Sequence, residues 1–178
     1  MKRVTVWAMS ALCVAALHTG CSDETKWSAV HRMIETQFGD VHQMTTGALH
    51  QQMSSGQRPV LLDVRSSEEF AVSHLRGARR VDPDLEDLSV LDSIDRDADI
   101  VVYCSVGYRS ARFAKRMTEA GFRNVVNLRG SIFRWANQGR RVVRDGAAVR
   151  EVHPYDDVWG HLLRSELHAH RPGGAGAS

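Results

Sequence analysis

Hydrophobic residues along the chain form two kinds of pattern, and their order predicts an α/β protein. Residues 99–103 (Asp-Ile-Val-Val-Tyr) form a continuous run rich in β-branched residues, which is typical of a strand buried on both faces. In the segment that follows, Phe113, Ala114 and Met117 recur at helical spacing, and Gly121 stands where a C-terminal cap is expected. A buried strand that leads directly into such a helix indicates an α/β fold.

Helical spacing and turn residues predict further elements on both sides of this unit. Helices are expected at residues 27–38 and 46–53, a surface turn plus helix at 82–91, and a helix at 156–167. The run Ser66-Ser-Glu-Glu69 has the pattern of a capping box and opens a further short helix. Residues 141–150 have a hairpin pattern around the Asp145-Gly146 turn.

The loop between the strand and the helix carries the clearest chemical signal. It begins at Cys104 and continues through Gly107 to Arg109. This cysteine follows the carboxyl end of a strand, where open α/β sheets bind ligands, and it faces a helix N-terminus. Helix N-termini and guanidinium groups stabilise a thiolate, and Gly107 can adopt the positive φ that turns backbone N–H groups inward. The loop is therefore predicted to hold a negative sulfur, with a buried core cysteine as the ordinary alternative.

Four motifs in sequence order resemble the rhodanese (sulfurtransferase) family. Residues 104–110 (Cys-Ser-Val-Gly-Tyr-Arg-Ser) match its Cys-x-x-Gly-x-Arg-Ser active loop. Residues 60–65 (Val-Leu-Leu-Asp-Val-Arg) resemble its first core strand with an Asp-x-Arg ending, and residues 70–78 resemble the aromatic-x-x-x-His-Ile-x-Gly-Ala motif that follows. Residues 125–128 and Trp135 resemble its last strand and the tryptophan after it.

The resemblance covers about residues 45–143 and departs from the family at one turn. The family usually has Gly-Gly after its last strand, whereas this chain has Arg129-Gly130-Ser131. The departure affects the local turn and the rim of the pocket. The resemblance implies an open parallel β-sheet flanked by helices, with an N-terminal helix before it and a C-terminal hairpin plus helix beyond it.

The resemblance also implies a reaction. Rhodaneses carry a sulfane sulfur as a persulfide on the loop cysteine, so the Cys104 thiolate is expected to attack a donor such as thiosulfate and release sulfite. A thiol or cyanide then removes the sulfur, and neither a metal nor an organic cofactor is required. The loop residues implied to bind substrate and persulfide are Ser105, Val106, Gly107, Tyr108, Arg109 and Ser110.

Two other functions remain open from the sequence. One is a persulfide carrier or binding module without turnover, although such modules commonly lose the cysteine that this loop retains. The other is phosphatase or arsenate-reductase chemistry on an oxyanion. The related oxyanion enzymes have five residues between Cys and Arg, whereas Cys104 and Arg109 are separated by four, which favours a cradle for a single sulfur atom.

Side chains outside the loop supply further candidates. Asp63 and Arg65 end a strand at the same edge as Cys104, so they could orient the loop or line its entrance. A buried Asp63 that satisfies backbone N–H groups is an equally good interpretation, and Arg65 is the better candidate for attracting an anionic donor. His74 is expected to hydrogen-bond locally and pack the turn rather than act as a base.

Two hydroxyls and two aromatic rings complete the candidate site. Ser105 and Ser110 can donate hydrogen bonds to the loop sulfur, and Ser110 can equally act as a helix cap. Tyr108 and Trp135 are expected to form pocket walls, with core packing as the alternative for Trp135. His161, His168 and His170 lie close in sequence but lack a known ligand spacing, so no metal site is expected there.

The start of the chain has the features of an export signal. Lys2 and Arg3 precede an uncharged apolar stretch at residues 6–17, which is too short to span a bilayer and has the length of a signal h-region. Gly20-Cys21 then resembles the end of a bacterial lipobox, with Leu17 one position too far upstream. The favoured expectation is a bacterial envelope protein that faces the periplasm and is anchored by a lipid on Cys21. The alternatives are secretion as a soluble periplasmic protein and an uncleaved N-terminal anchor.

Removal of a signal peptide changes the charge and cysteine content. The first twenty residues hold two basic and no acidic side chains, so the remainder has 21 basic and 21 acidic residues. This balance gives no indication of nucleic-acid binding. Of the three cysteines, Cys13 lies in the signal and Cys21 would be acylated, which leaves Cys104 as the free thiol.

The patterns divide the chain of 178 residues around one folded domain. The predicted parts are a signal peptide (1–20), an N-terminal helical segment (21–44), the rhodanese domain (45–143), a C-terminal hairpin and helix extension (144–170) and a disordered tail (171–178).

Overall fold

The computed structural model describes residues 23–173. The predicted signal peptide, the acylation site at Cys21 and most of the predicted tail lie outside these residues. Within residues 23–173, none of the helices combines the length and the apolar character needed to cross a membrane.

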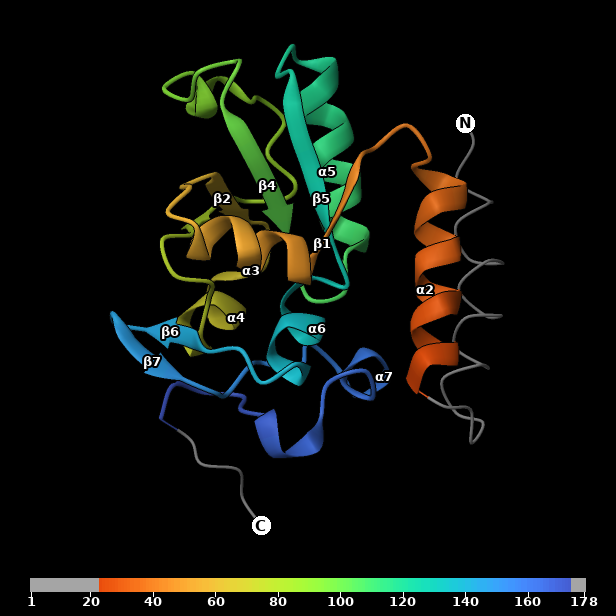
Figure 1. Ribbon diagram of the computed structural model, residues 1–178, viewed down its shortest axis with the longest axis vertical. Helices are drawn as coiled ribbons and strands as arrows, with labels where there is room; N and C mark the ends of the chain where they lie inside the picture. The colour runs from red at the N-terminus through yellow and green to blue at the C-terminus, as the bar shows by residue number, and fades with distance from the viewer. Residues whose placement is uncertain (1–22, 174–178) are drawn as a thin grey trace.

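A five-stranded parallel sheet forms the centre of the molecule, in the order β1-β5-β4-β2-β3 (Figure 1). The strands are β1 (Gln43–Thr45), β2 (Val60–Asp63), β3 (Arg79–Arg80), β4 (Asp99–Tyr103) and β5 (Asn124–Arg129). The central strand β4 is buried from Ile100 to Tyr103, as its continuous hydrophobic run predicts. The predicted α/β fold with an open parallel sheet is confirmed.

Helices cover both faces of this sheet. The helix α5 (Tyr108–Glu119) packs on β4 and β5 from one side, and α3 (Thr46–Ser54) lies on the other side beside α6 (Ser131–Asn137) (Figure 1). The short helix α4 (Ser67–Val72) begins with the predicted capping box, in which Ser66 and Glu69 satisfy each other's backbone N–H groups. Parallel strands require such crossover connections, so all strand ends that carry candidate residues meet at one edge.

The N-terminal helix α2 (Asp23–Gln37) begins four residues before the predicted start at residue 27. It buries Trp27, Val30 and Ile34 against the domain. The Ile34 side chain reaches the active loop, because a Cβ built on Gly107 would lie 3.3 Å from Ile34 Cδ1. The N-terminal segment therefore packs directly against the cysteine loop.

The predicted hairpin is present as β6 (Val142–Arg144) and β7 (Ala147–Val149), joined by Asp145-Gly146. A β-bridge between His74 and Val143 joins it to the domain. Beyond it, Val152, Leu162, Leu163 and Leu167 enter the same hydrophobic core as the sheet. The extension thus docks on the domain.

The continuous helix predicted at residues 156–167 is wrong. The structure has one helical turn, α7 (Asp157–Gly160), and a 3₁₀ turn, η2 (Ser165–Leu167). The side chain of Asn137 on α6 donates to the Leu162 carbonyl at 2.7 Å and accepts from the Arg164 N–H at 3.0 Å. These bonds engage backbone groups that a continuous helix would pair internally, so a tertiary contact overrides the local helical spacing.

The helix expected within residues 82–91 is reduced to a 3₁₀ turn, η1 (Ser89–Leu91). Asp82 and Asp87 accept hydrogen bonds from the N–H groups two residues ahead, at Asp84 and Ser89. Such Asx turns compete with helical hydrogen bonding and keep the segment irregular.

Candidate active site

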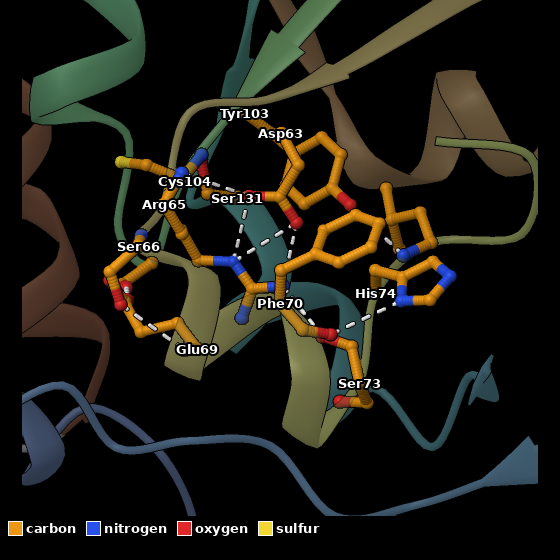
Figure 2. Close-up of polar contacts among 12 residues, drawn as sticks. Asp63, Arg65, Ser66, Glu69, Phe70, Ser73, His74, Tyr103, Cys104 and Ser131 are labelled. Atoms are coloured by element: carbon orange, nitrogen blue, oxygen red, sulfur yellow. Dashed lines mark hydrogen bonds and ion pairs between the residues drawn. The ribbon is translucent and has the colours of Figure 1, made fainter. Parts of the chain in front are cut away.

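The active loop occupies residues 104–107, between the end of β4 and the start of α5. Gly107 has a φ of 116° and is the N-cap of α5, so it supplies the positive φ that the sequence predicts. The segment that follows β5 fixes the backbone of Cys104, because the Cys104 N–H donates to Ser131 Oγ at 3.1 Å (Figure 2). The Ile132 N–H donates to the Cys104 carbonyl at 3.2 Å, so both polar backbone groups of the cysteine are fixed.

The Cys104 sulfur is surrounded by hydrogen-bond donors although the residue is only 1% exposed. The Gly107 N–H donates to Sγ at 3.2 Å, and Ser110 Oγ lies 3.5 Å from Sγ. Burial by itself raises the pKa of the Cys104 thiol, but the charge of Arg109 and hydrogen bonds from Ser110 and Gly107 outweigh it. The pKa of Cys104 is therefore lowered, and the thiolate is favoured.

This lowered pKa predicts that Cys104 reacts at lower pH than an ordinary cysteine. Alkylation follows the thiolate fraction, so the rate with iodoacetamide should reach half its maximum at a lower pH in the folded protein than in the unfolded protein. The rate would be followed at the peptide that contains Cys104, in folded protein and in protein unfolded by denaturant. A folded-state midpoint equal to or above the unfolded one would contradict the electrostatics of the loop.

A buried ion pair supports the loop from the capping box of α4. Glu69 accepts bidentate hydrogen bonds from Arg109, each 2.8 Å long, and a third from the Ser105 hydroxyl at 2.7 Å. Burial raises the pKa of Glu69, but the Arg109, Ser66 and Ser105 contacts outweigh it and lower that pKa to about 2. The carboxylate thus stays charged and holds Arg109 beside the sulfur. The sequence had identified Glu69 only as part of a capping box.

The two predicted hydroxyl donors have different roles. Ser105 donates to Glu69, so its expected role toward the sulfur is wrong; its hydroxyl anchors the ion pair instead. Ser110 lies near the sulfur as predicted but also donates to Asn127 Oδ1 at 2.6 Å. The Asn127 amide donates in turn to the Gly107 carbonyl at 3.1 Å, so this buried asparagine of β5 fixes the end of the loop where α5 begins. Sequence reasoning missed Asn127.

Asp63 and Arg65 do not line the entrance. Arg65 has no exposed surface, and its guanidinium donates to Asp63 Oδ1 at 2.9 Å and to Asp63 Oδ2 at 2.6 Å (Figure 2). It also donates to the Ser73 carbonyl at 2.6 Å. An arginine held in this way cannot meet an incoming anion, so the expected attraction of the donor by Arg65 is wrong. The pair instead ties the end of β2 to the end of α4.

Of the three remaining candidates, His74 and Trp135 pack away from the cavity at Cys104, and Tyr108 lines it. His74 donates from Nδ1 to the Phe70 carbonyl at 3.2 Å and stacks on the Phe70 ring, as predicted (Figure 2). Trp135 is buried and donates from its indole N–H to the Arg141 carbonyl at 3.1 Å. It lies outside the cavity at Cys104, so its predicted role as a pocket wall is wrong. Tyr108 does line that cavity.

A cavity of about 100 Å³ opens at the sulfur. Its lining residues are Cys104, Ser105, Val106, Tyr108, Arg109, Tyr155 and Trp159. The last two belong to the C-terminal extension, and the sequence had not connected them with the site. Among residues 23–173, no group of three or more His, Cys, Asp or Glu side chains is placed to hold a metal ion. The arrangement can form and shelter a covalent adduct on one activated sulfur.

Residues 45–138 match the rhodanese-like domain family. The match covers more than half of the chain, and the protein belongs to this family. A sulfurtransferase from Allochromatium vinosum is 29% identical over 103 residues, which cover 58% of this chain and 95% of that protein. The probable adenylyltransferase/sulfurtransferase MoeZ of Mycobacterium tuberculosis is 33% identical over 96 residues, or 53% of this chain. The matched region spans about a quarter, 24%, of MoeZ.

Solved structures with the same fold include proteins of very different length. A rhodanese-like domain protein from Staphylococcus aureus has a TM-score of 0.53 and 23% identity, and the match covers 59% of this chain and 99% of that one. A thiosulfate sulfurtransferase from Pseudomonas aeruginosa has a TM-score of 0.56 and 19% identity, covering 63% of this chain and 22% of that one. At these identities the likeness shows the fold alone.

Proposed function

We propose that this protein moves a sulfane sulfur from thiosulfate to a thiol or cyanide through a persulfide on Cys104. The observation that carries the proposal is the Cys104 sulfur itself. Cys104 lines a small cavity, its sulfur accepts a hydrogen bond from the Gly107 N–H, and its thiol has a lowered pKa. A nucleophile that is activated by a lowered pKa, without an adjacent base, suits covalent sulfur transfer.

In the loading step the Cys104 thiolate attacks the outer sulfur of thiosulfate. A sulfur–sulfur bond forms to Cys104, the bond to the sulfonate group breaks, and sulfite leaves with its electron pair. The added sulfur carries the negative charge into the cavity. The N-terminus of α5 follows the Cys104 loop directly, and its first backbone N–H groups have no partner within the helix. A helix N-terminus of this kind stabilises a nearby anion such as the persulfide.

In the transfer step an acceptor thiolate or cyanide attacks the outer persulfide sulfur. The bond to Cys104 breaks, Cys104 leaves as a thiolate, and the acceptor departs as a persulfide or thiocyanate. The lowered pKa of Cys104 assists this step as well, because a thiolate of lower pKa is a better leaving group. Arg109 remains paired with Glu69 throughout and supplies a fixed positive charge near the sulfur.

The proposal is tested by intact mass after exposure to thiosulfate. The full chain would carry Cys13→Ser and Cys21→Ser, so that Cys104 is its only thiol. We expect a gain of one sulfur atom that cyanide removes with release of thiocyanate, and no gain when Cys104→Ser is added. If the thiol remains alkylatable but gains no sulfur, the thiosulfate reaction is excluded. A sulfur that loads but leaves with neither cyanide nor thiols would identify a carrier without turnover.

A further inference from the structure

The wall of the cavity that faces the loop comes from outside the matched family domain. The family match ends at residue 138, whereas Tyr155 and Trp159 belong to the C-terminal extension. All other lining residues lie in or next to the cysteine loop. A molecule that enters this cavity therefore meets these two aromatic side chains as well as the loop.

The extension holds Tyr155 in an unusual backbone conformation. Its φ is 71°, and the Asp156 N–H donates to the Pro154 carbonyl at 3.0 Å, which makes Tyr155 the centre of a γ-turn. A non-glycine residue with this φ is strained, and such strain persists where the surrounding structure fixes it. Here the Tyr155 N–H donates to His153 Nδ1 at 3.0 Å. The turn presents a tyrosine that is still 44% exposed beside the catalytic sulfur.

Trp159 is fixed by the helix that follows this turn. The Asp156 carboxylate caps α7 by accepting from the Val158 N–H at 3.0 Å and the Trp159 N–H at 2.7 Å. The α-carbon of Gly160 packs so closely on Pro154 that a Cβ there would lie 3.2 Å from the Pro154 Cβ. Tyr155 and Trp159 are thus held by one compact turn.

The cationic side chain at the mouth of the cavity already has a carboxylate partner. The Arg109 guanidinium is paired with Glu69, and its carbon lies 4.5 Å from the centre of the Tyr155 ring. A cation stacked in this way stabilises the ring's position. The mouth therefore presents aromatic surface rather than a free positive charge, and its selectivity rests mainly on size.

We propose that Tyr155 and Trp159 form a gate that admits small acceptors and excludes cysteine thiols on the surface of folded proteins. A cavity of about 100 Å³ holds roughly seven to ten water-sized groups, since one water needs roughly 10–15 Å³ of such volume. Cyanide or a low-molecular-weight thiol fits this space, whereas a folded surface cannot follow its cysteine past the two rings. The inference rests on the proposed sulfur transfer and specifies its acceptor class.

The gate is tested by single-turnover transfer from the loaded persulfide in the Cys13→Ser, Cys21→Ser full chain. Cyanide and 2-mercaptoethanol serve as small acceptors, and reduced thioredoxin serves as the protein thiol. In Tyr155→Ala, and in Tyr155→Ala with Trp159→Ala, we expect the ratio of the thioredoxin rate to the cyanide rate to rise by ~10-fold or more. Val90→Ala, which removes an exposed side chain remote from the cavity, should leave the ratio unchanged.

A second measurement tests access to Cys104 through the gate and does not require a persulfide. Cys104 would be alkylated by iodoacetamide and by a bulky maleimide–polyethylene glycol reagent, and the two rates compared. The gate predicts that Tyr155→Ala accelerates the bulky reagent selectively, even if thiosulfate fails to load sulfur. Because Tyr155 is exposed, its substitution should leave the folded core intact. An unchanged rate ratio in both assays, with folding retained, would overturn the gate while leaving sulfur loading unaffected.

Discussion

Replacing Arg109 with methionine is expected to slow sulfur loading by ~100-fold at neutral pH, a typical cost for removing one fixed electrostatic donor from an active site. The Arg109 charge is the largest contribution that lowers the pKa of Cys104 against the effect of burial. Without it, the pH at which Cys104 alkylation is half-maximal should rise. The loading rate should recover in part at high pH, where the thiolate forms without assistance.

The structure offers a matched control for this change. Arg112 lies on the same helix, but it is half-exposed and pairs with the exposed Asp84. Arg112→Met should therefore leave both loading and the alkylation profile unchanged. An equal loss of activity in the two variants, or an unshifted pH profile in Arg109→Met, would show that the Arg109 charge does not activate the sulfur.

Arg109→Met also leaves the Glu69 carboxylate buried without its partner, so stability must be separated from reactivity. Adding Glu69→Gln removes that unpaired charge and should restore part of the free energy of unfolding. It should not restore the loading rate, because the cation beside the sulfur remains absent. Equilibrium unfolding in denaturant, measured alongside loading, distinguishes the two effects.

Replacing Arg65 with methionine should lower the free energy of unfolding by about 3–5 kcal/mol, the usual cost of breaking a fully buried ion pair. Neither Asp63 nor Arg65 has any exposed surface, and Asp63 would be left as an uncompensated buried carboxylate. The Ser73 carbonyl would also lose its donor. The measurement is urea unfolding monitored by tryptophan fluorescence. The dependence of the unfolding free energy on urea concentration should be the same in the variant and in the unsubstituted protein.

Arg123→Met is the control for this prediction, because Arg123 pairs with Asp97 on the surface, where both side chains are largely exposed. An exposed pair contributes about 0–1 kcal/mol, so this change should have little effect. Asp63→Asn added to Arg65→Met should recover part of the loss. If Arg65→Met costs no more than Arg123→Met, the buried pair does not stabilise the end of β2.

Local patterns were sufficient for the central strand of the sheet and for the cysteine loop, whereas β1 and β3 were not predicted. The burial of β4, the start of α5, the positive φ of Gly107 and the hairpin at Asp145-Gly146 all depend on residues within a few positions of one another. Hydrophobic periodicity and turn chemistry act over that same range. The export signal and the lipid on Cys21 stay predictions, since residues 1–22 lie outside the described part of the chain.

The partners of the charged residues could not be predicted in this way. Arg65 and Arg109 each follow a strand end in sequence, yet one is fully buried against Asp63 and the other faces the cavity. Glu69 is 40 positions from Arg109, and the sequence contains many other carboxylates that could equally have been its partner. Which ion pair forms depends on how α4 packs against the loop, and no local spacing encodes that packing.

The shape of the cavity also depended on tertiary structure. Trp135 follows the last strand closely, yet it packs into the core, whereas Tyr155 and Trp159 come from a distant segment that folds back over the loop. The sequence by itself determined the nucleophile and the strand–loop–helix unit that activates it, because short-range geometry is sufficient for both. Only the tertiary structure decided what surrounds the sulfur, because burial and neighbours are set by the packing of segments far apart in the chain.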